Sequence, residues 1–396
     1  MDGLLAQIGD FGSIGNILWF IFFIFFMFFY QRIMITQMLW KFEQTAEMLE
    51  GMAVKGKKIV LKKISKKPDK KLDENISNFL EFFMIEPVNL DPYGIMKKIE
   101  HLTNLEEKRF KYFVKEIASS LDEESQANVV MGLSGAISLN QVAKVVRHYV
   151  EMIRKYKNLQ LAMLLQMQMP MIERIAKALL NGTESLSNGW PIGDCAGSLV
   201  VAHMIGDQKT KEIEEDTVMA VKRMKGKNVY FIKAKGPGGR LGRLGKSVER
   251  IIKKNKIAKI ISVDAAAKLE GEKTGSVAEG IGVAIGGIGV DRSYIENLAV
   301  QKNIPIDSVV IKMSQEEAIQ PILNEIISAT PRVIKIIESN VKKTRGNVIV
   351  VGVGNTAGVG DNKKSAEEAE KLAKNILKIV KGRKKEKKGF FNWIGG

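Results

Sequence analysis

The apolar run at residues 14–30 constrains the fold of this chain more than any other feature of its sequence. No residue between Phe11 and Gln31 carries a charge. A run of 17 to 21 such residues is long enough to cross a membrane hydrocarbon core of about 30 Å as a helix. The alternative, a buried helix of a soluble domain, is less favoured because eight Phe fall within residues 11–29. We therefore expect a transmembrane helix within residues 1–31.

Charged residues flank this run asymmetrically. Asp2 and Asp10 precede it, whereas Arg32, Lys41 and nine Lys within residues 55–71 follow it. A cleaved signal peptide would carry its basic residues ahead of the apolar run, so we expect the segment to be retained. The positive-inside rule then predicts a single-pass protein of the cell membrane, with its N-terminus outside and the bulk of the chain in the cytoplasm.

Two basic segments favour contact with anionic lipid headgroups, in keeping with a formal net charge of +17. Residues 32–74 are interpreted as an amphipathic helix followed by a lysine-rich linker. The linker either forms a membrane-facing patch or is a solvated segment. Residues 381–396 form a basic tail with three aromatic residues near its end. We expect this tail to touch the membrane again, and a disordered tail is the competing interpretation.

The rest of the chain predicts two soluble domains. In residues 75–180 apolar residues recur at three- and four-residue spacing, which predicts a helical domain. Its Met-rich segment 163–171 is interpreted as a buried kinked helix, with a flexible binding surface as the alternative. From residue 181 to 380, helical stretches alternate with β-branched runs, which predicts an α/β domain of three layers with a mostly parallel sheet. The strand-like runs are 229–232, 257–263, 283–288, 309–313 and 348–353.

Composition excludes several kinds of chemistry. Cys195 is the only cysteine, so no intrachain disulfide and no cysteine-rich metal site can form. The three histidines, His101, His148 and His203, make a multi-histidine metal site improbable. We expect no metal and no cofactor. The basic runs lack interleaved aromatic residues, so sequence-specific nucleic-acid binding is not expected.

A glycine-rich loop at residues 236–245 follows a predicted strand and leads into a predicted helix, the usual place for a phosphate-binding loop. It continues as Gly-Lys-Ser, but a P-loop requires Gly where Arg240 stands. General anion binding remains open against a purely structural turn. The candidate anion-binding residues are Gly238, Gly239, Arg240, Gly242, Arg243, Gly245 and Lys246.

Two aspartates stand out in the same half of the chain. Asp264 ends an apolar strand, and Asp194 precedes an apolar helix that starts near Leu199. Each aspartate could simply cap the next turn. Brought together, two carboxylates can hold one proton between them, which supplies both an acid and a base for the attack of water on an amide.

Residues 189–315 resemble the germination protease of spore-forming bacteria and, more distantly, are similar to the hydrogenase-maturation proteases, which share a three-layer α/β fold. The resemblance rests on Asp194-x-x-Gly197, the loop 236–245, Val263-Asp264-Ala265-Ala266, Thr274-Gly275 and Gly287-Ile288-Gly289-Val290-Asp291-Arg292. It implies that Asp194 and Asp264 carry hydrolysis. The maturation-type relatives bind metal with an additional His, whereas this chain has no His after His203, so a metal-free aspartate pair is implied.

The whole chain also resembles an archaeal family of membrane-anchored proteins classed as a domain of unknown function, a resemblance that implies no activity. Two functions follow as expectations. One is a membrane-tethered hydrolase, of the endopeptidase kind, that acts on a protein substrate through Asp194 and Asp264. The other is a non-enzymatic binding or ligand-sensing module that holds an anion at the loop 236–245. The sequence predicts no oligomeric state.

Overall fold

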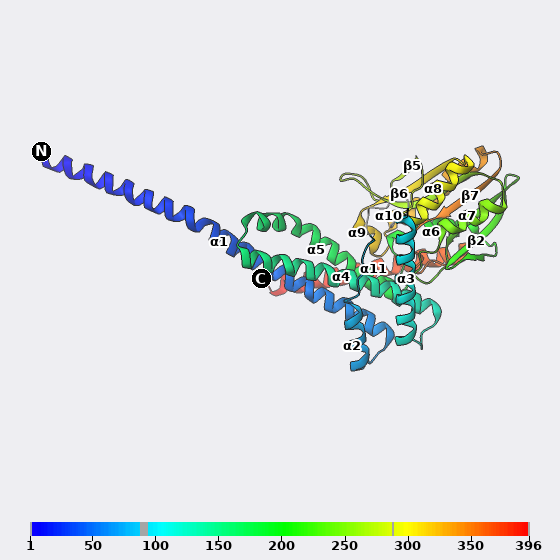
Figure 1. Cartoon of the computed structure of the whole chain (residues 1–396), viewed down its shortest axis with the longest axis horizontal. Helices are drawn as coiled ribbons and strands as arrows, with labels where there is room; N and C mark the ends of the chain where they lie inside the picture. The colour runs from blue at the N-terminus through cyan, green and yellow to red at the C-terminus, as the bar shows by residue number, and fades with distance from the viewer. Residues whose placement is uncertain (1, 88–93, 287–288, 395–396) are drawn as a thin grey trace. The chain divides into compact units, whose positions relative to one another are not determined.

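A computed structural model of the chain describes residues 2–87, 94–286 and 289–394, without the side chains of residues 2–14, 16, 17, 27, 28, 31 and 381–394 (Figure 1). The chain divides into two compact units. One comprises residues 1–53 and 140–176, and the other comprises residues 54–139 and 177–396. The N-terminal half is mostly helical, and the C-terminal half carries a mixed sheet.

The described residues of the first unit are helical, apart from the connection at residues 157–158. This unit holds most of α1 (Asp2–Ile64), the last part of α4 (Glu123–Tyr156) and the first part of α5 (Leu159–Asn188). Arg147 of α4 is paired with Glu43 and, at 2.7 Å, with Glu50 of α1. These ion pairs flank a core to which both helices contribute, and its buried residues include Phe42, Ala46, Leu49, Val146 and Val150.

Apolar exposure marks two parts of the first unit. Every large apolar side chain described between Leu18 and Tyr30 of α1 is exposed, with Trp19 at 70%. In the Met-rich part of α5, Met169 is buried but Met163 and Met167 are exposed, so the buried helix predicted there is only half buried. Within the described residues, α4 alone is long and apolar enough to cross a membrane, and 44% of its most apolar window is buried.

Helices also form the first part of the second unit: α2 (Lys70–Phe79), α3 (Ile95–Ile117), the start of α4 and the end of α5. Phe79 of α2 stacks on Phe113 of α3 with ring centroids 3.9 Å apart. The lysine-rich stretch 55–71, predicted to be a linker, is helical up to Ile64. It stays helical because Lys is a good helix former and because Val60 and Leu61 are buried in this core.

In the described residues the sheet has seven strands, in the order β1-β2-β3-β7-β4-β6-β5. The strands are β1 (Lys211–Glu214), β2 (Thr217–Met224), β3 (Lys227–Ala234), β4 (Ile257–Ala267), β5 (Val277–Ile281), β6 (Ile306–Met313) and β7 (Asn347–Gly352). The sheet is mixed, so the prediction of a mostly parallel sheet is wrong. The central strands β3, β7, β4 and β6 run parallel, whereas β1, β2 and β5 pair antiparallel with their neighbours. Lys225 and Gly226 both have positive φ and join β2 to β3 in a tight hairpin, which leaves no room for a crossover helix.

The strand predicted at residues 283–288 is absent from the described residues 283–286. Their backbone bonds to side chains instead: the Ala284 N–H donates to Ser308 Oγ (2.9 Å), and the Gly286 N–H donates to Asp264 Oδ2 (3.0 Å). This loop therefore belongs to the site described below.

Helices cover both faces of the sheet, as the three-layer prediction requires. The helices of this half are α6 (Ala196–Ile205), α7 (Leu244–Lys254), α8 (Val290–Lys302), α9 (Gln315–Ile319), α10 (Asn324–Lys343) and α11 (Lys363–Ile394), with a 3₁₀ turn η1 (Gly193–Cys195). In β7, Val348 and Val350 face a core shared with α6, α10 and α11, whereas Ile349 and Val351 face a core shared with α7 and α8. Burying each such side chain contributes about 1.5–3 kcal/mol.

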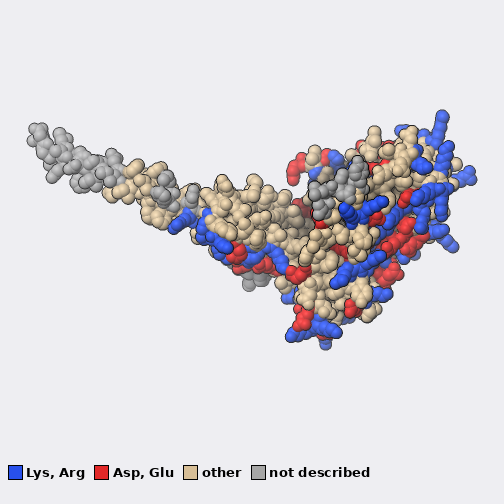
Figure 2. Space-filling view, in the orientation of Figure 1, with Lys and Arg blue, Asp and Glu red and all other residues tan. Residues whose placement is uncertain are grey.

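Charge is dispersed over the surface in view. Figure 2 shows Lys and Arg side chains mixed with Asp and Glu across the α/β part of this face. The prediction of a basic and aromatic tail at residues 381–396 concerns side chains that lie outside the described ones. The backbone of helix α11 is described as far as Ile394.

Candidate functional site

A cavity of about 340 Å³ lies beyond the carboxyl ends of β4 and β7, and both predicted aspartates line it. Asp264 comes from β4, Asp194 from η1, and Gly354 follows β7. The structure thus brings together two residues that are 70 positions apart in the sequence. This edge of the parallel strands is where open α/β sheets bind their ligands.

Asp264 is held by backbone donors and shielded from water. Its side chain is 5% exposed. Oδ1 accepts a hydrogen bond from the Ala265 N–H (2.6 Å), and Oδ2 accepts one from the Gly286 N–H (3.0 Å). Burial first, and then the negative charge of Asp194, raise the pKa of Asp264 to about 7.

The loop that supplies the Gly286 N–H is fixed by a buried pair of hydroxyls. Ser262 Oγ and Ser308 Oγ lie 2.8 Å apart, on the neighbouring strands β4 and β6. The Ala284 N–H donates to Ser308 Oγ at 2.9 Å. Two serines at paired positions of the sheet therefore position the loop that binds Asp264.

Asp194 lies at the start of the turn that leads into α6. Its Oδ2 accepts a hydrogen bond from the Asn355 N–H at 2.8 Å, and burial raises the pKa of its carboxyl. Glycine permits this close approach: Gly354 has φ +104°, and a Cβ there would lie 1.9 Å from the Asp194 carbonyl oxygen. A Cβ at Gly197 would lie 2.2 Å from the Val263 carbonyl oxygen. The Asp194-x-x-Gly197 spacing thus lets η1 pack against the strand ends.

The two aspartates lie apart from the basic side chains that the structure describes. Among the described residues, no Lys or Arg forms an ion pair with Asp194 or Asp264. The cations that line the cavity are engaged elsewhere, since Arg243 pairs with Glu107 and Lys246 lies 2.5 Å from Glu100. The described part of the chain also holds no group of three or more His, Cys, Asp or Glu placed to bind a metal ion.

One wall of the cavity comes from α3, which the sequence analysis missed. Glu100 accepts hydrogen bonds from Lys246 and from the Tyr294 hydroxyl (2.9 Å), and burial together with Glu100 raises the pKa of Tyr294 to about 12. Glu107 pairs with Arg243. No local signal in residues 95–117 distinguishes these acids from the solvated acids of any amphipathic helix.

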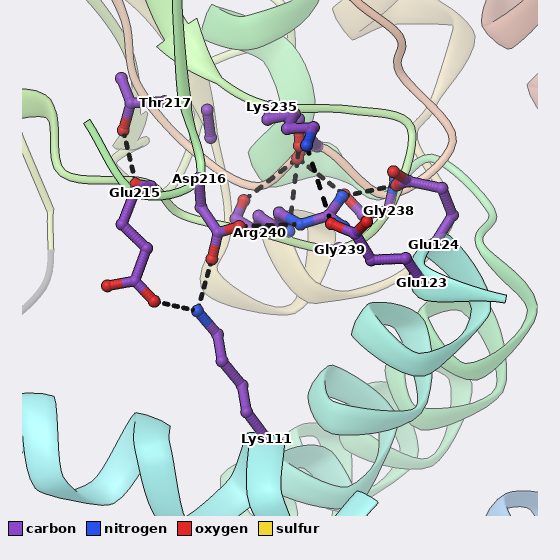
Figure 3. A network of polar contacts seen from close by, with 12 residues as sticks. Lys111, Glu123, Glu124, Glu215, Asp216, Thr217, Lys235, Gly238, Gly239 and Arg240 are labelled. Atoms are coloured by element: carbon purple, nitrogen blue, oxygen red, sulfur yellow. Dashed lines mark hydrogen bonds and ion pairs between the residues drawn. The ribbon is translucent and has the colours of Figure 1, made fainter. Parts of the chain in front are cut away.

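Most backbone donors of the glycine-rich loop are occupied by the protein's own acceptors. The Gly238 N–H donates to Glu124 (2.6 Å), the Gly239 N–H to Asn128 (2.8 Å) and the Gly245 N–H to Asp291 (2.6 Å). Arg240 is 6% exposed. Figure 3 shows its guanidinium among acidic side chains, with distances of 2.5 Å to Glu124, 3.3 Å to Glu123 and 3.1 Å to Asp216.

Six of the seven predicted anion-binding residues therefore have internal partners, Gly242 being the exception. The loop joins the start of α4 to the sheet, so the structural alternative accounts for its glycines and its charge. An anion entering here would have to displace carboxylates that already neutralise Arg240.

Two family models match the chain. Residues 192–360 match the domain of unknown function (DUF1512) C-terminal, and residues 16–189 match the protein of unknown function (DUF1512) N-terminal domain. The chain belongs to the DUF1512 family. No curated protein and no solved structure matches it. In this DUF1512 protein both aspartates lie in the C-terminal domain, whereas the α3 wall of their cavity comes from the N-terminal domain.

Proposed function

We propose that this DUF1512 protein is a membrane-anchored hydrolase that cleaves amide bonds in a protein substrate through Asp194 and Asp264. One observation carries the proposal: two carboxylates line the same cavity, neither has an ion-pair partner among the described Lys and Arg side chains, and the pKa of Asp264 is about 7. Perturbed carboxyl groups in a cleft are typical of catalytic sites. The resemblance of residues 189–315 to the germination protease supports the same assignment.

The proposed chemistry uses one proton shared by the pair. In this scheme Asp264, whose pKa is about 7, holds the proton, and Asp194 is the negatively charged neighbour that raises this pKa. Asp194 takes a proton from a water molecule as its oxygen attacks the amide carbon, and Asp264 gives its proton to the departing nitrogen. Each turnover breaks one C–N bond and forms one C–O bond. It leaves Asp194 protonated and Asp264 ionised, and proton exchange with solvent restores the starting state of the pair.

The test is hydrolysis of an unfolded protein, such as denatured casein, by the purified full chain in detergent. Asp194→Asn and Asp264→Asn should each lower the rate at least 1,000-fold, because each removes a proton-transfer group. Asp291→Asn is the matched control: Asp291 lines the same cavity, and its carboxylate accepts a bond from the Gly245 N–H at the start of α7. Equal loss in all three variants, or no loss in the first two, would refute the aspartate pair.

We propose that residues 14–30 anchor the chain in the cell membrane, with the N-terminus outside and the α/β half in the cytoplasm. The exposed apolar side chains between Leu18 and Tyr30 support this placement, because a soluble helix would bury them. In a Cys195→Ser background, an impermeant thiol reagent added to intact cells should label Gly3→Cys and miss Lys58→Cys. Lys58 is exposed in the structure, so the opposite labelling pattern would contradict the topology.

Anionic lipids are the proposed partner of the lysine-rich stretch 55–71 and of residues 381–396. Deleting residues 381–396 from a protein that starts at residue 54 should abolish most of its low-salt binding to vesicles containing phosphatidylserine. The truncation has to keep residues 54–71, because Val60 and Leu61 belong to the core of the second unit. Unchanged binding would remove the tail from the proposal.

A further inference from the structure

A second cavity, of about 470 Å³, adjoins the aspartate cavity. The two cavities share four lining residues, namely Glu107, Leu241, Gly242 and Arg243. All of the residues that line both cavities belong to one compact unit. The two cavities are therefore neighbours, with these four residues forming the wall between them.

The lining of the second cavity favours an apolar group. Ala127, Val130 and Met131 of α4, each partly exposed, contribute apolar surface. Charged residues beside them form ion pairs: Lys111 lies 2.7 Å from Glu215 and 2.6 Å from Asp216, and Figure 3 shows the end of the Lys111 side chain between the two carboxylates. Because these charges are paired, apolar contact rather than ionic attraction selects what enters.

The shared wall offers free backbone groups. Leu241 is 49% exposed, and Gly242 has φ +71°. Among the described residues, no backbone hydrogen bond involves Leu241 or Gly242, in contrast to Gly238, Gly239 and Gly245 of the same loop. An extended polypeptide can pair its own N–H and C=O groups with such a segment.

We infer that the two cavities form one peptide-binding groove, in which the substrate lies across Leu241 and Gly242 and places a large apolar side chain in the second cavity. The inference rests on the proposed function for the amide that lies at Asp194 and Asp264. It adds the substrate class: an extended polypeptide with a bulky apolar residue beside the cleaved bond. Val130 and Met131 then set specificity.

Binding of capped tripeptides to the full-length Asp264→Asn chain in detergent tests this inference without turnover. The probes are acetyl-Ala-Phe-Ala-amide and acetyl-Ala-Ala-Ala-amide, and calorimetry measures both affinities. We expect the Phe peptide to bind at least tenfold more tightly. Val130→Phe fills the cavity and should remove this preference, whereas Ser134→Phe, at an exposed position of α4 outside the cavity, should keep it. Equal affinities, no binding, or a preference that survives Val130→Phe would overturn the inference.

A second variant guards against misfolding of Val130→Phe. Met131→Ala enlarges the cavity and should shift the preference from Phe toward Trp, and an unchanged order of affinities would count against the groove. The two proposals fail separately. Casein hydrolysis that depends on Asp194 and Asp264 but shows no preference for apolar residues refutes the groove alone, whereas peptide preference without hydrolysis refutes the hydrolase alone.

Discussion

The glycine-rich loop 236–245 and the aspartate cavity lie side by side in the DUF1512 C-terminal domain. The buried charges of the two regions have opposite kinds of charged neighbours. Arg240 of the loop is almost fully buried and has three acidic partners. Asp264 is equally buried but has a second carboxylate, Asp194, as its charged neighbour. A buried charge whose partners are in place is tolerated in the fold, whereas an uncompensated buried charge costs stability and is typical of functional sites.

Removing the cation from the compensated cluster should have the largest effect. Arg240→Met leaves Glu124 and Asp216 without their buried partner, so we expect the free energy of unfolding to fall by about 3–5 kcal/mol. Urea denaturation followed by circular dichroism measures the change. Arg250→Met is the control, because Arg250 is exposed and pairs with Glu214 (2.8 Å), a kind of ion pair worth at most about 1 kcal/mol. Equal losses of stability in the two variants would show that the buried ion pairs of Arg240 contribute no more than an exposed ion pair.

The uncompensated pair should show itself in the pH dependence of hydrolysis. Because Asp264 has to hold a proton and its pKa is about 7, the rate should fall roughly tenfold per pH unit above 7. Initial rates of casein hydrolysis between pH 5 and 9 measure this slope. A rate that stays constant up to pH 9 would show that no proton on Asp264 is required.

The same pair should destabilise the fold at neutral pH. The pKa of Asp264 is raised from 3.8 to about 7 on folding, so the folded state binds its proton more tightly than the unfolded state does. The stability linked to this carboxyl is therefore present below pH 4 and is lost as the pH rises to 7. We expect Asp264→Asn to be about 1–3 kcal/mol more stable than the native chain at pH 8 and equal to it at pH 4.

Denaturation at both pH values tests this expectation, with Asp291→Asn as the matched variant. Burial also raises the pKa of Asp291, but Lys246 and Arg243 counteract the shift, so its gain at pH 8 should be smaller. A gain at pH 4 as large as the gain at pH 8 would mean that charge is not its cause.

The smallest effect should come from the exposed edge of the compensated cluster. Lys111 pairs with Glu215 and Asp216, but its side chain is 41% exposed. Solvent screens such pairs, so Lys111→Met should lower the free energy of unfolding by no more than about 1 kcal/mol. Thermal denaturation of this variant beside Arg240→Met measures the contrast. A loss of stability as large as that of Arg240→Met would mean that solvent exposure does not determine how much these ion pairs contribute.

Much of the α/β half follows from local pattern. Continuous apolar runs predicted β3, β4, β6 and β7, because central strands are buried on both faces. The edge strands were missed since β1 and β5 are short and largely exposed, and their pattern resembles that of loops. The antiparallel pairing of β1, β2 and β5 depends on turn geometry and on partners distant in sequence.

The sequence predicted the parts of the site that a single residue in its local context reveals. Asp264 lies near the carboxyl end of an apolar strand and Asp194 precedes an apolar helix, and the carboxyl ends of parallel strands are where such groups meet. The partners of the loop 236–245 were not predictable, because Glu123, Glu124 and Asn128 lie more than 100 residues earlier in the chain. Nothing local in the sequence reports that Arg240 is already neutralised.

A site-resolved titration of the aspartate carboxyl groups tests the central claim most directly. Carbon-13 NMR of the full chain labelled at aspartate carboxyl carbons, with Asp264→Asn used for assignment, should show Asp264 titrating near pH 7. In Asp194→Asn the midpoint should move downward, because the neighbouring negative charge is gone. A midpoint of Asp264 near pH 4, or one that does not move in Asp194→Asn, would contradict the shared-proton pair.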